Sequence, residues 1–341
     1  ASFFSELLMT NGLNQLISEL AHLYLIAEVN SIGIGPEPRG AGLFLLLSSV
    51  NHTCLPNCMY TWNQIEGQVE VRAINTIQSG AEIGFSYLND LYLPTKARQE
   101  ILEHNWFFRC ECLRCLSRNE DGRYLRAIGC EQCVSGFVLP PMQTDTPRQW
   151  QCESCGHASG EDFSAREGAL RLRVEEAQKR FSLKKRRQGP DDAESSLREL
   201  RELIDALKSS RLHPNHFLLF AATGLVAQGL WQMGGANHIK EAIELQLEYK
   251  QKCLAVFPSH WPETASAFET LGNMYAVQYH IDGDPSTLRE TIAALNTCIQ
   301  HIRVCYGESG ERMADVKEQL FLLEAPATLQ RLKVLYGSSA S

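Results

Sequence analysis

The spacing of hydrophobic residues divides the chain into two parts of different character. Between residues 59 and 87, apolar and polar residues alternate in short runs, a pattern typical of half-buried strands. After Gly160, apolar residues recur every three or four positions, which is the spacing of amphipathic helices. The pattern therefore predicts an α+β fold class, with a β-rich first part and an all-α second part.

In the first part the pattern predicts helices and short strands. The predicted elements are an amphipathic helix over 3–28 that is broken near Asn11-Gly12, a hairpin of strands 59–62 and 68–74 around Glu66-Gly67, and a strand over 83–87. The Gly- and Pro-rich residues 30–42 indicate a loop or short irregular strand, and the apolar run 43–47 indicates a buried strand or a turn. Because these elements are short, we expect other parts of the chain to pack against them and cover their apolar residues.

A further helix is predicted to begin at Thr95, whose hydroxyl can accept a hydrogen bond from a first-turn amide. Helical spacing predicts an inward and a solvent-facing set of residues in this helix. The inward set is Ala97, Ile101 and Leu102, and the solvent-facing set is Lys96, Arg98 and Glu100.

The second part is predicted to consist of long helices with prolines near their starts, where a missing amide costs least. The predicted helices span 164–187, 191–209, 215–233, 237–256, 262–280, 286–306 and 311–335. Polar turns before His213-Pro214, His260-Trp261-Pro262 and Tyr306-Gly307 recur roughly every 47 residues, near the period of two-helix repeats. We expect a tetratricopeptide-like stack that folds autonomously, with an irregular helical bundle as the alternative.

Composition narrows the class of protein. The 341 residues are 44% hydrophobic and 21% charged, as in a globular protein, and they carry a formal charge of −8. This charge argues against nucleic-acid binding, which needs a basic face. It suits a basic peptide partner, and it is equally explained by simple solubility. No apolar run reaches the ~18 residues of a membrane span, so no membrane association is expected.

The twelve cysteines are unevenly distributed, with nine of them between Cys54 and Cys155. Two Cys-x-x-Cys pairs, separated by 18 residues, have the spacing of a four-thiolate zinc site. They are Cys130, Cys133, Cys152 and Cys155, with two disulfides or a redox pair as alternatives. His157 is an alternative ligand two residues after the last of them.

A second group, Cys110, Cys112 and Cys115, has three thiols where a closed zinc site needs four ligands. The missing ligand must come from a distant part of the chain. Cys54 and Cys58 are both candidates, and spacing does not choose between them.

The segment Asn51-His52-Thr53-Cys54-Leu55-Pro56-Asn57 combines an amide, an imidazole and a stiff turn, groups that can hold a flat polar cofactor. Together with Glu82-Ile83-x-Phe85-Ser86-Tyr87 and Phe108-x-Cys110-x-Cys112-x-x-Cys115, it resembles the second half of SET-domain lysine methyltransferases. The resemblance covers roughly residues 30–160 and is greatest to the SET-and-MYND (SMYD) branch, in particular to its arthropod members.

This resemblance implies roles for individual residues. Cys54 would be the fourth ligand of the first zinc ion, and Tyr87 would be the catalytic residue that places its phenol beside the methyl group and the substrate lysine. Contacts to S-adenosylmethionine would come from Ser48, Asn51, His52 and Phe108. The glycine-rich first strand and the MYND module of the family have no counterpart in these residues, and we expect them upstream of Ala1. Ile32 and Gly84 depart from the family's usual residues at an aromatic channel wall and at a strand position.

The resemblance also implies a domain plan. It places the C-terminal half of a SET domain at 1–88, with a helical insert at 1–28, a post-SET zinc module at 89–120, a second zinc module at 121–160 and the helical repeat domain at 161–341. We expect a monomeric S-adenosylmethionine-dependent protein-lysine methyltransferase that acts on a histone or another protein. The alternatives are a non-catalytic scaffold that binds proteins through its helices and a zinc-ribbon adaptor in transcription. The basic run from Lys184 to Arg187 indicates either a nuclear import signal or a solvated helix end, and we expect the protein in nucleus and cytoplasm.

Overall fold

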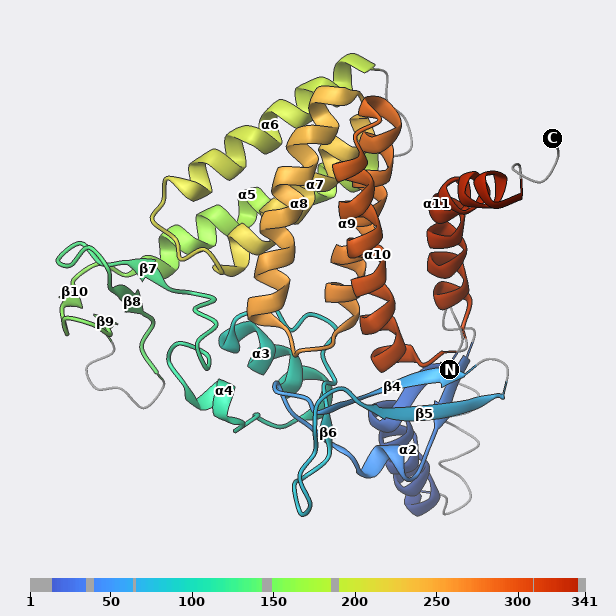
Figure 1. Cartoon of the computed structure of the whole chain (residues 1–341). Helices are drawn as coiled ribbons and strands as arrows, with labels where there is room; N and C mark the ends of the chain where they lie inside the picture. Colours follow the sequence, from blue (N-terminus) through green and yellow to red (C-terminus); the bar gives the residue numbers. More distant parts are fainter. Residues whose placement is uncertain are drawn as a thin grey trace.

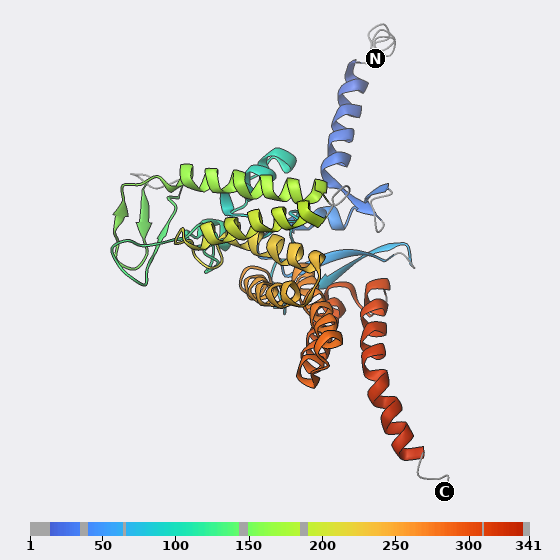
Figure 2. The same cartoon turned by 90° about the horizontal axis from the view of Figure 1, so that it is seen from above.

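The computed structural model describes residues 14–34, 40–63, 66–142, 149–184, 190–308 and 310–336. The strands and short helices of the first 160 residues lie at one end of the molecule, and the long helices rise from them (Figure 1). Helix α2 (Asn14–Asn30) projects away from the rest of the chain (Figure 2) and exposes several of its apolar side chains, such as Leu23 and Tyr24. Among the described residues, no helix is both long and apolar enough to cross a membrane.

Short paired strands form the first part. Strand β1 (Ser31–Ile34) pairs with β2 (Gly40–Leu43), and β4 (Cys58–Asn63) pairs with β5 (Gln68–Ala73), both antiparallel. Strand β3 (Asn51–His52) lies parallel to β6 (Gly84–Phe85), so the Asn-His motif and the strand before Tyr87 lie side by side. The predicted hairpin and the last strand are present, and the predicted loop at 30–42 contributes two strands.

The apolar run 43–47 is not a buried strand. It forms a turn in which Leu45 and Leu46 are 79% and 89% exposed, followed by the short 3₁₀ turn η1 (Leu47–Ser49). Only Leu47 of these three leucines is buried. The alternative interpretation of this run as a turn is therefore correct, because apolar composition alone does not report burial.

Helix α3 (Thr95–Trp106) leads to α4 (Leu113–Leu116), where the first group of cysteines lies. The expectation that Thr95 caps α3 is wrong by one residue, since Pro94 occupies the cap position without a side-chain bond. The hydroxyl of Thr95 instead accepts a hydrogen bond from Arg98 Nη2 at 2.9 Å. The second cysteine module follows as a four-stranded antiparallel sheet, in the order β10-β9-β8-β7. Its strands are β7 (Ile128–Gly129), β8 (Phe137–Leu139), β9 (Trp150–Cys152) and β10 (Ala158–Ser159).

The helical part matches the sequence prediction to within a few residues at each end. Its helices are α5 (Phe163–Lys184), α6 (Pro190–Lys208), α7 (Phe217–Met233), α8 (Ala236–Val256), α9 (Pro262–Asp282), α10 (Pro285–Tyr306) and α11 (Glu311–Tyr336). Consecutive helices pack against each other from α6 to α11, which is the arrangement of a tetratricopeptide-like stack. The fold is thus a β-rich part with two cysteine modules followed by an all-α helical domain. Residues 3–13 and 185–187 of the predicted helices lie outside the described residues.

The largest hydrophobic core crosses the boundary between the two parts. Leu88, Leu91 and Leu102 of the first part share one buried cluster with Phe220 and Phe257 of the helices. Backbone bonds also cross it, from Phe217 N to Leu125 O and from Gly129 N to Arg211 O. This packing argues against the expected autonomy of the helical part, because removing the first part would expose apolar surface on α7 and α8.

Candidate active site and zinc centres

Four thiols from two distant segments meet in a buried cluster beside β3. Cys54 follows the Asn-His motif, whereas Cys110, Cys112 and Cys115 follow α3, and the four sulfurs lie within 4.8 Å of one another. Cys58 lies outside this group, and its thiol donates to the carbonyl of Gly84 at 3.4 Å. Hydrogen bonds from the other three thiols hold the pKa of Cys54 far below its ordinary value. Four sulfurs at this separation, one of them readily ionised, fit a tetrahedral zinc ion.

A buried guanidinium lies against these sulfurs. Arg98 is 0% exposed, and its Nε and Nη2 donate to Cys54 Sγ at 3.3 Å and to Cys115 Sγ at 3.6 Å. Its Nη1 donates to Glu120 at 2.6 Å. The solvent-facing position predicted for Arg98 is therefore wrong. Four thiolates around Zn²⁺ leave a net negative charge, and a buried cation beside them offsets part of that charge.

His52 connects this cluster to Tyr87. The backbone N–H of Tyr87 donates to His52 Nδ1 at 2.9 Å, which leaves the ring proton on Nε2. Nε2 lies 3.3 Å from Cys54 Sγ and can donate to that sulfur. The imidazole thus links the zinc ligand to the backbone of the predicted catalytic residue, a contact that the sequence did not indicate.

The second group of thiols lies at the outer end of the molecule, in the small sheet β7–β10 (Figure 1). Cys130, Cys133, Cys152 and Cys155 place their sulfurs within 4.8 Å of one another, and Cys155 is exposed. This set also fits a tetrahedral zinc ion. His157 lies outside the group and contributes only its carbonyl, which accepts from the Cys152 N–H at 2.9 Å.

Tyr87 lines a small cavity of about 170 Å³ between β1, η1 and α3. Its hydroxyl donates to the carbonyl of Val50 at 2.7 Å, and burial raises the pKa of the phenol. Ser48, whose hydroxyl donates to Phe44 O at 2.9 Å, lines the same cavity. Two of the predicted site residues are therefore brought to one cavity.

The other predicted cofactor contacts lie around it. The rings of His52 and Phe108 are 6.0 Å apart, and the ring of Tyr87 lies 5.3 Å from the first and 6.3 Å from the second. Neither His52 nor Phe108 lines the cavity itself. The exposed Asn51 is directed elsewhere, since its amide donates to Glu82 at 2.8 Å.

Sequence reasoning missed other residues of the site. Trp106 lines the cavity with its ring 5.3 Å from that of Tyr87, and its indole N–H donates to Val29 O at 3.1 Å. Gln99 fixes the first cysteine after α3 by exchanging two hydrogen bonds with the backbone of Cys110. Helical spacing could have indicated Arg98, because it precedes the buried Leu102 by four residues.

Two departures from the family pattern have different explanations. A Cβ at Gly84 would lie 2.8 Å from Thr53 Cγ2, so the close approach of β6 to the Asn-His segment requires glycine there. Ile32 lines the cavity of Tyr87, where it provides an aliphatic wall.

Comparisons with known proteins agree with this geometry. The family model "SET domain" matches residues 17–88. Over 122 residues the chain is 36% identical to the SET domain-containing protein SmydA-8, isoform B, of Drosophila melanogaster. The aligned segment covers 36% of this chain and 27% of that protein. Residues 17–88 are thus similar to a SET domain, and the matched relative is a SET-domain protein of the SMYD type.

A longer similarity extends into the helices. The chain is 24% identical over 305 residues to the N-lysine methyltransferase SMYD2 of Homo sapiens. This alignment covers 87% of this chain and 59% of that protein. The chain thus spans less than two thirds of the length of either relative. A putative kinesin light chain with TPR-like repeats from Podosopora anserina aligns at 14% identity and a TM-score of 0.34, over 51% of this chain and 77% of the other.

Proposed function

We propose that this protein is a SMYD-type, S-adenosylmethionine-dependent protein-lysine N-methyltransferase. The observation that carries the proposal is the position of Tyr87 in an aromatic cavity, directly joined through His52 to a zinc cluster. S-adenosylmethionine, when bound, supplies the methyl group. The residues that would hold it are Ser48 in the cavity and His52 and Phe108 beside it, and Asn51 would join them only if its amide left Glu82.

The chain's own residues would orient the side-chain amine of the substrate lysine and remove its water. A free lysine has a pKa of ~10.4, so the site must favour the loss of its proton. Tyr87 stays a neutral phenol because burial raises its pKa, and its donation to Val50 fixes the oxygen in place. That oxygen can still accept a hydrogen bond from the amine. The rings of Trp106 and Phe85 exclude water on either side of Tyr87.

A route for the lysine is present beside this cavity. A second cavity of about 450 Å³ lies between β4 and the start of α9, and Gly33, Tyr60 and Phe85 line both cavities. A peptide in the second cavity would therefore have its side chain within reach of Tyr87. A histone substrate, a role in transcription and a location in nucleus and cytoplasm remain proposals that follow from the family resemblance.

The test is a methyl-transfer assay on lysine peptides with the complete protein. Tyr87→Phe keeps the ring, so we expect a drop in kcat of ~10²-fold with cofactor affinity nearly unchanged. Tyr124→Phe is the matched control, because Tyr124 lines none of these cavities and its hydroxyl, like that of Tyr87, donates to an oxygen, Glu153 Oε2 at 3.2 Å. A protein that folds and holds zinc but transfers no methyl group would instead be a scaffold that binds partners through its helices.

A further inference from the structure

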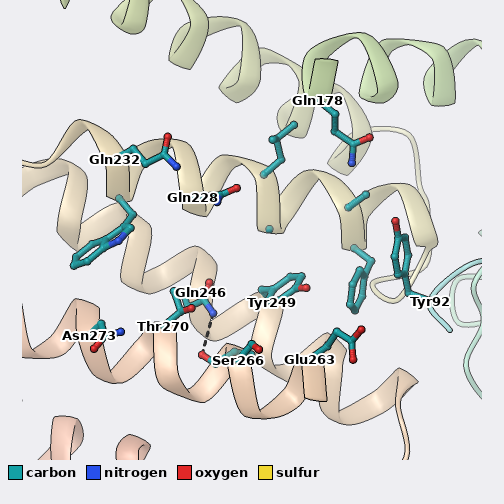
Figure 3. Close-up of a pocket in the computed structure, with 16 residues that line it drawn as sticks. Tyr92, Gln178, Gln228, Gln232, Gln246, Tyr249, Glu263, Ser266, Thr270 and Asn273 are labelled. Atoms are coloured by element: carbon teal, nitrogen blue, oxygen red, sulfur yellow. Dashed lines mark hydrogen bonds between the residues drawn. The ribbon is translucent and has the colours of Figure 1, made fainter. Parts of the chain in front are cut away.

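The helical domain contains a groove, lined by both polar and apolar side chains, that the methyl-transfer site does not use. It has a volume of about 600 Å³ and lies between α7 and α9, with Tyr249 of α8 at its base (Figure 3). Amide and hydroxyl groups line it, from Gln178, Gln228, Gln232, Gln246, Thr270 and Asn273. Groups that both donate and accept hydrogen bonds suit the backbone of an extended peptide.

The groove and the second cavity meet at one residue. Glu263, in the first turn of α9, lines both of them. The second cavity in turn shares its wall with the cavity of Tyr87. A peptide that follows this path would pass Glu263 before its lysine reached Tyr87.

Among the described residues that line the groove and the second cavity, Glu263 is the only charged one. Its Oε2 is buried, with no hydrogen-bond partner among the described residues, and no described cation forms an ion pair with it. Arg312, which acts on it from a distance, is itself bound to Glu269 at 2.7 Å. A carboxylate that is desolvated without a partner is costly, and a basic ligand would supply that partner.

A second observation points to a ligand at the same place. Trp261 lines the second cavity beside Glu263, is only 7% exposed, and its indole nitrogen has no hydrogen-bond partner among the described residues. Buried indole N–H groups usually find an acceptor. Burial, and to a lesser degree the charge of Asp90, raise the pKa of Glu263 to about 7, and a bound cation would lower it again by favouring the ionised carboxylate.

We infer that Glu263 binds a basic side chain of an extended peptide, whose backbone lies in the amide-lined groove. This inference rests on the proposed function only where it identifies that peptide as the substrate. It adds that the protein selects sequences with an arginine or a second lysine at a fixed distance from the target lysine. No Lys or Arg occurs among the lining residues that the structure describes in either cavity, which favours this basic partner over an acidic one.

The test measures the binding of short fluorescein-labelled peptides by anisotropy, with the 341-residue chain and without S-adenosylmethionine. Each peptide consists of Gly, Ser and Gln with one lysine and one arginine at varied separation. Matched peptides carry citrulline, which keeps the shape of arginine without its charge. We expect ~10-fold weaker binding of the citrulline peptide at the best separation.

Variants assign this difference to one residue. Glu263→Gln should lower the affinity for the arginine peptide by ~10-fold and remove its advantage over citrulline, with an unchanged urea unfolding midpoint. Glu290→Gln makes the same change of charge at an exposed position of α10 outside both cavities and should have no such effect. Equal affinities for the two peptides, no peptide binding, or an equal loss in both variants would overturn the inference.

The same peptides separate this inference from the proposed function. Binding that depends on Glu263, in a complete protein that transfers no methyl group, would support the peptide site and overturn the methyltransferase. Methyl transfer at equal rates to arginine and citrulline peptides would support the enzyme and overturn the role of Glu263.

Discussion

The two cysteine clusters have the same ligands but very different surroundings. The cluster of Cys54 is buried, gathers ligands from distant segments and contacts Arg98 and His52. The cluster of Cys130 draws on two nearby Cys-x-x-Cys pairs, sits at the outer end of the molecule and leaves Cys155 exposed. The first cluster is part of the core that supports Tyr87. The second joins only neighbouring segments of one small sheet, and we call it the outer clasp.

This difference bears on how each cluster is linked to the rest of the fold. Around the first, Arg98 connects two sulfurs to Glu120, and Arg114 lies 3.5 Å from the same carboxylate. Charges in such a buried network depend on one another, because water cannot replace a missing partner. The second cluster can exchange a lost contact for solvent at its exposed edge.

Removing one ligand from each cluster should have the largest and most unequal effects. If each group holds one ion, elemental analysis should give two zinc ions for the unchanged protein and one for each variant. Cys54→Ser should also destabilise the whole protein, because a structural zinc site contributes on the order of ~10 kcal/mol of folding free energy. Cys133→Ser should lose its ion while the unfolding of the Asn-His segment in urea stays nearly unchanged.

These two variants can also contradict the comparison. Equal losses of stability would show that the outer cluster is as integral as the inner one. If elemental analysis found no zinc and the cysteines were paired as disulfides, neither cluster would be a zinc site.

Replacing Arg98 should have the next largest effect. Arg98→Met leaves Glu120 buried without its main cation, which costs about 3–5 kcal/mol. It should also weaken zinc binding at the first cluster, measured by competition with a chelator, and leave the second unaffected. Lys96→Met, on the exposed side of the same helix, should change stability by less than ~0.5 kcal/mol. If both variants unfold at the same urea concentration, Arg98 does not stabilise the first cluster.

The same contrast explains what the sequence could predict. The Cys-x-x-Cys pairs have a local spacing that indicates their site directly, and helical periodicity located α5–α11 within a few residues. The choice of Cys54 over Cys58 needed the family resemblance, because β3 and β6 bring the two parts together only in the folded chain.

Other features of the site depend on tertiary contacts that have no local signal. A charged residue such as Arg98 is normally solvated, so its burial follows from partners 17–44 positions away. Glu263 looks in the sequence like an ordinary first-turn carboxylate, and only the folded chain places it at a cavity with its Oε2 unpartnered among the described residues. The predicted autonomy of the helices stays a prediction, which the shared core argues against, since amphipathic spacing does not say which surface covers α7.

The smallest effect should come from a single methyl group in the outer cluster. A Cβ at Gly136 would lie 2.6 Å from Cys133 Sγ and 2.7 Å from Cys152 Sγ, so Gly136→Ala must displace at least one ligand. We expect a loss of zinc affinity of ~10-fold to ~100-fold at this cluster, the range for changes next to metal ligands, and none at the first cluster. Gly160→Ala is the matched control, because its Cβ would meet no atom within 4 Å and its backbone conformation is open to other residues. Chelator competition on both variants would measure the two affinities separately. A change in the cluster of Cys54 after Gly136→Ala would mean that the outer clasp is coupled to the core, and the distinction between core and outer clasp would no longer hold.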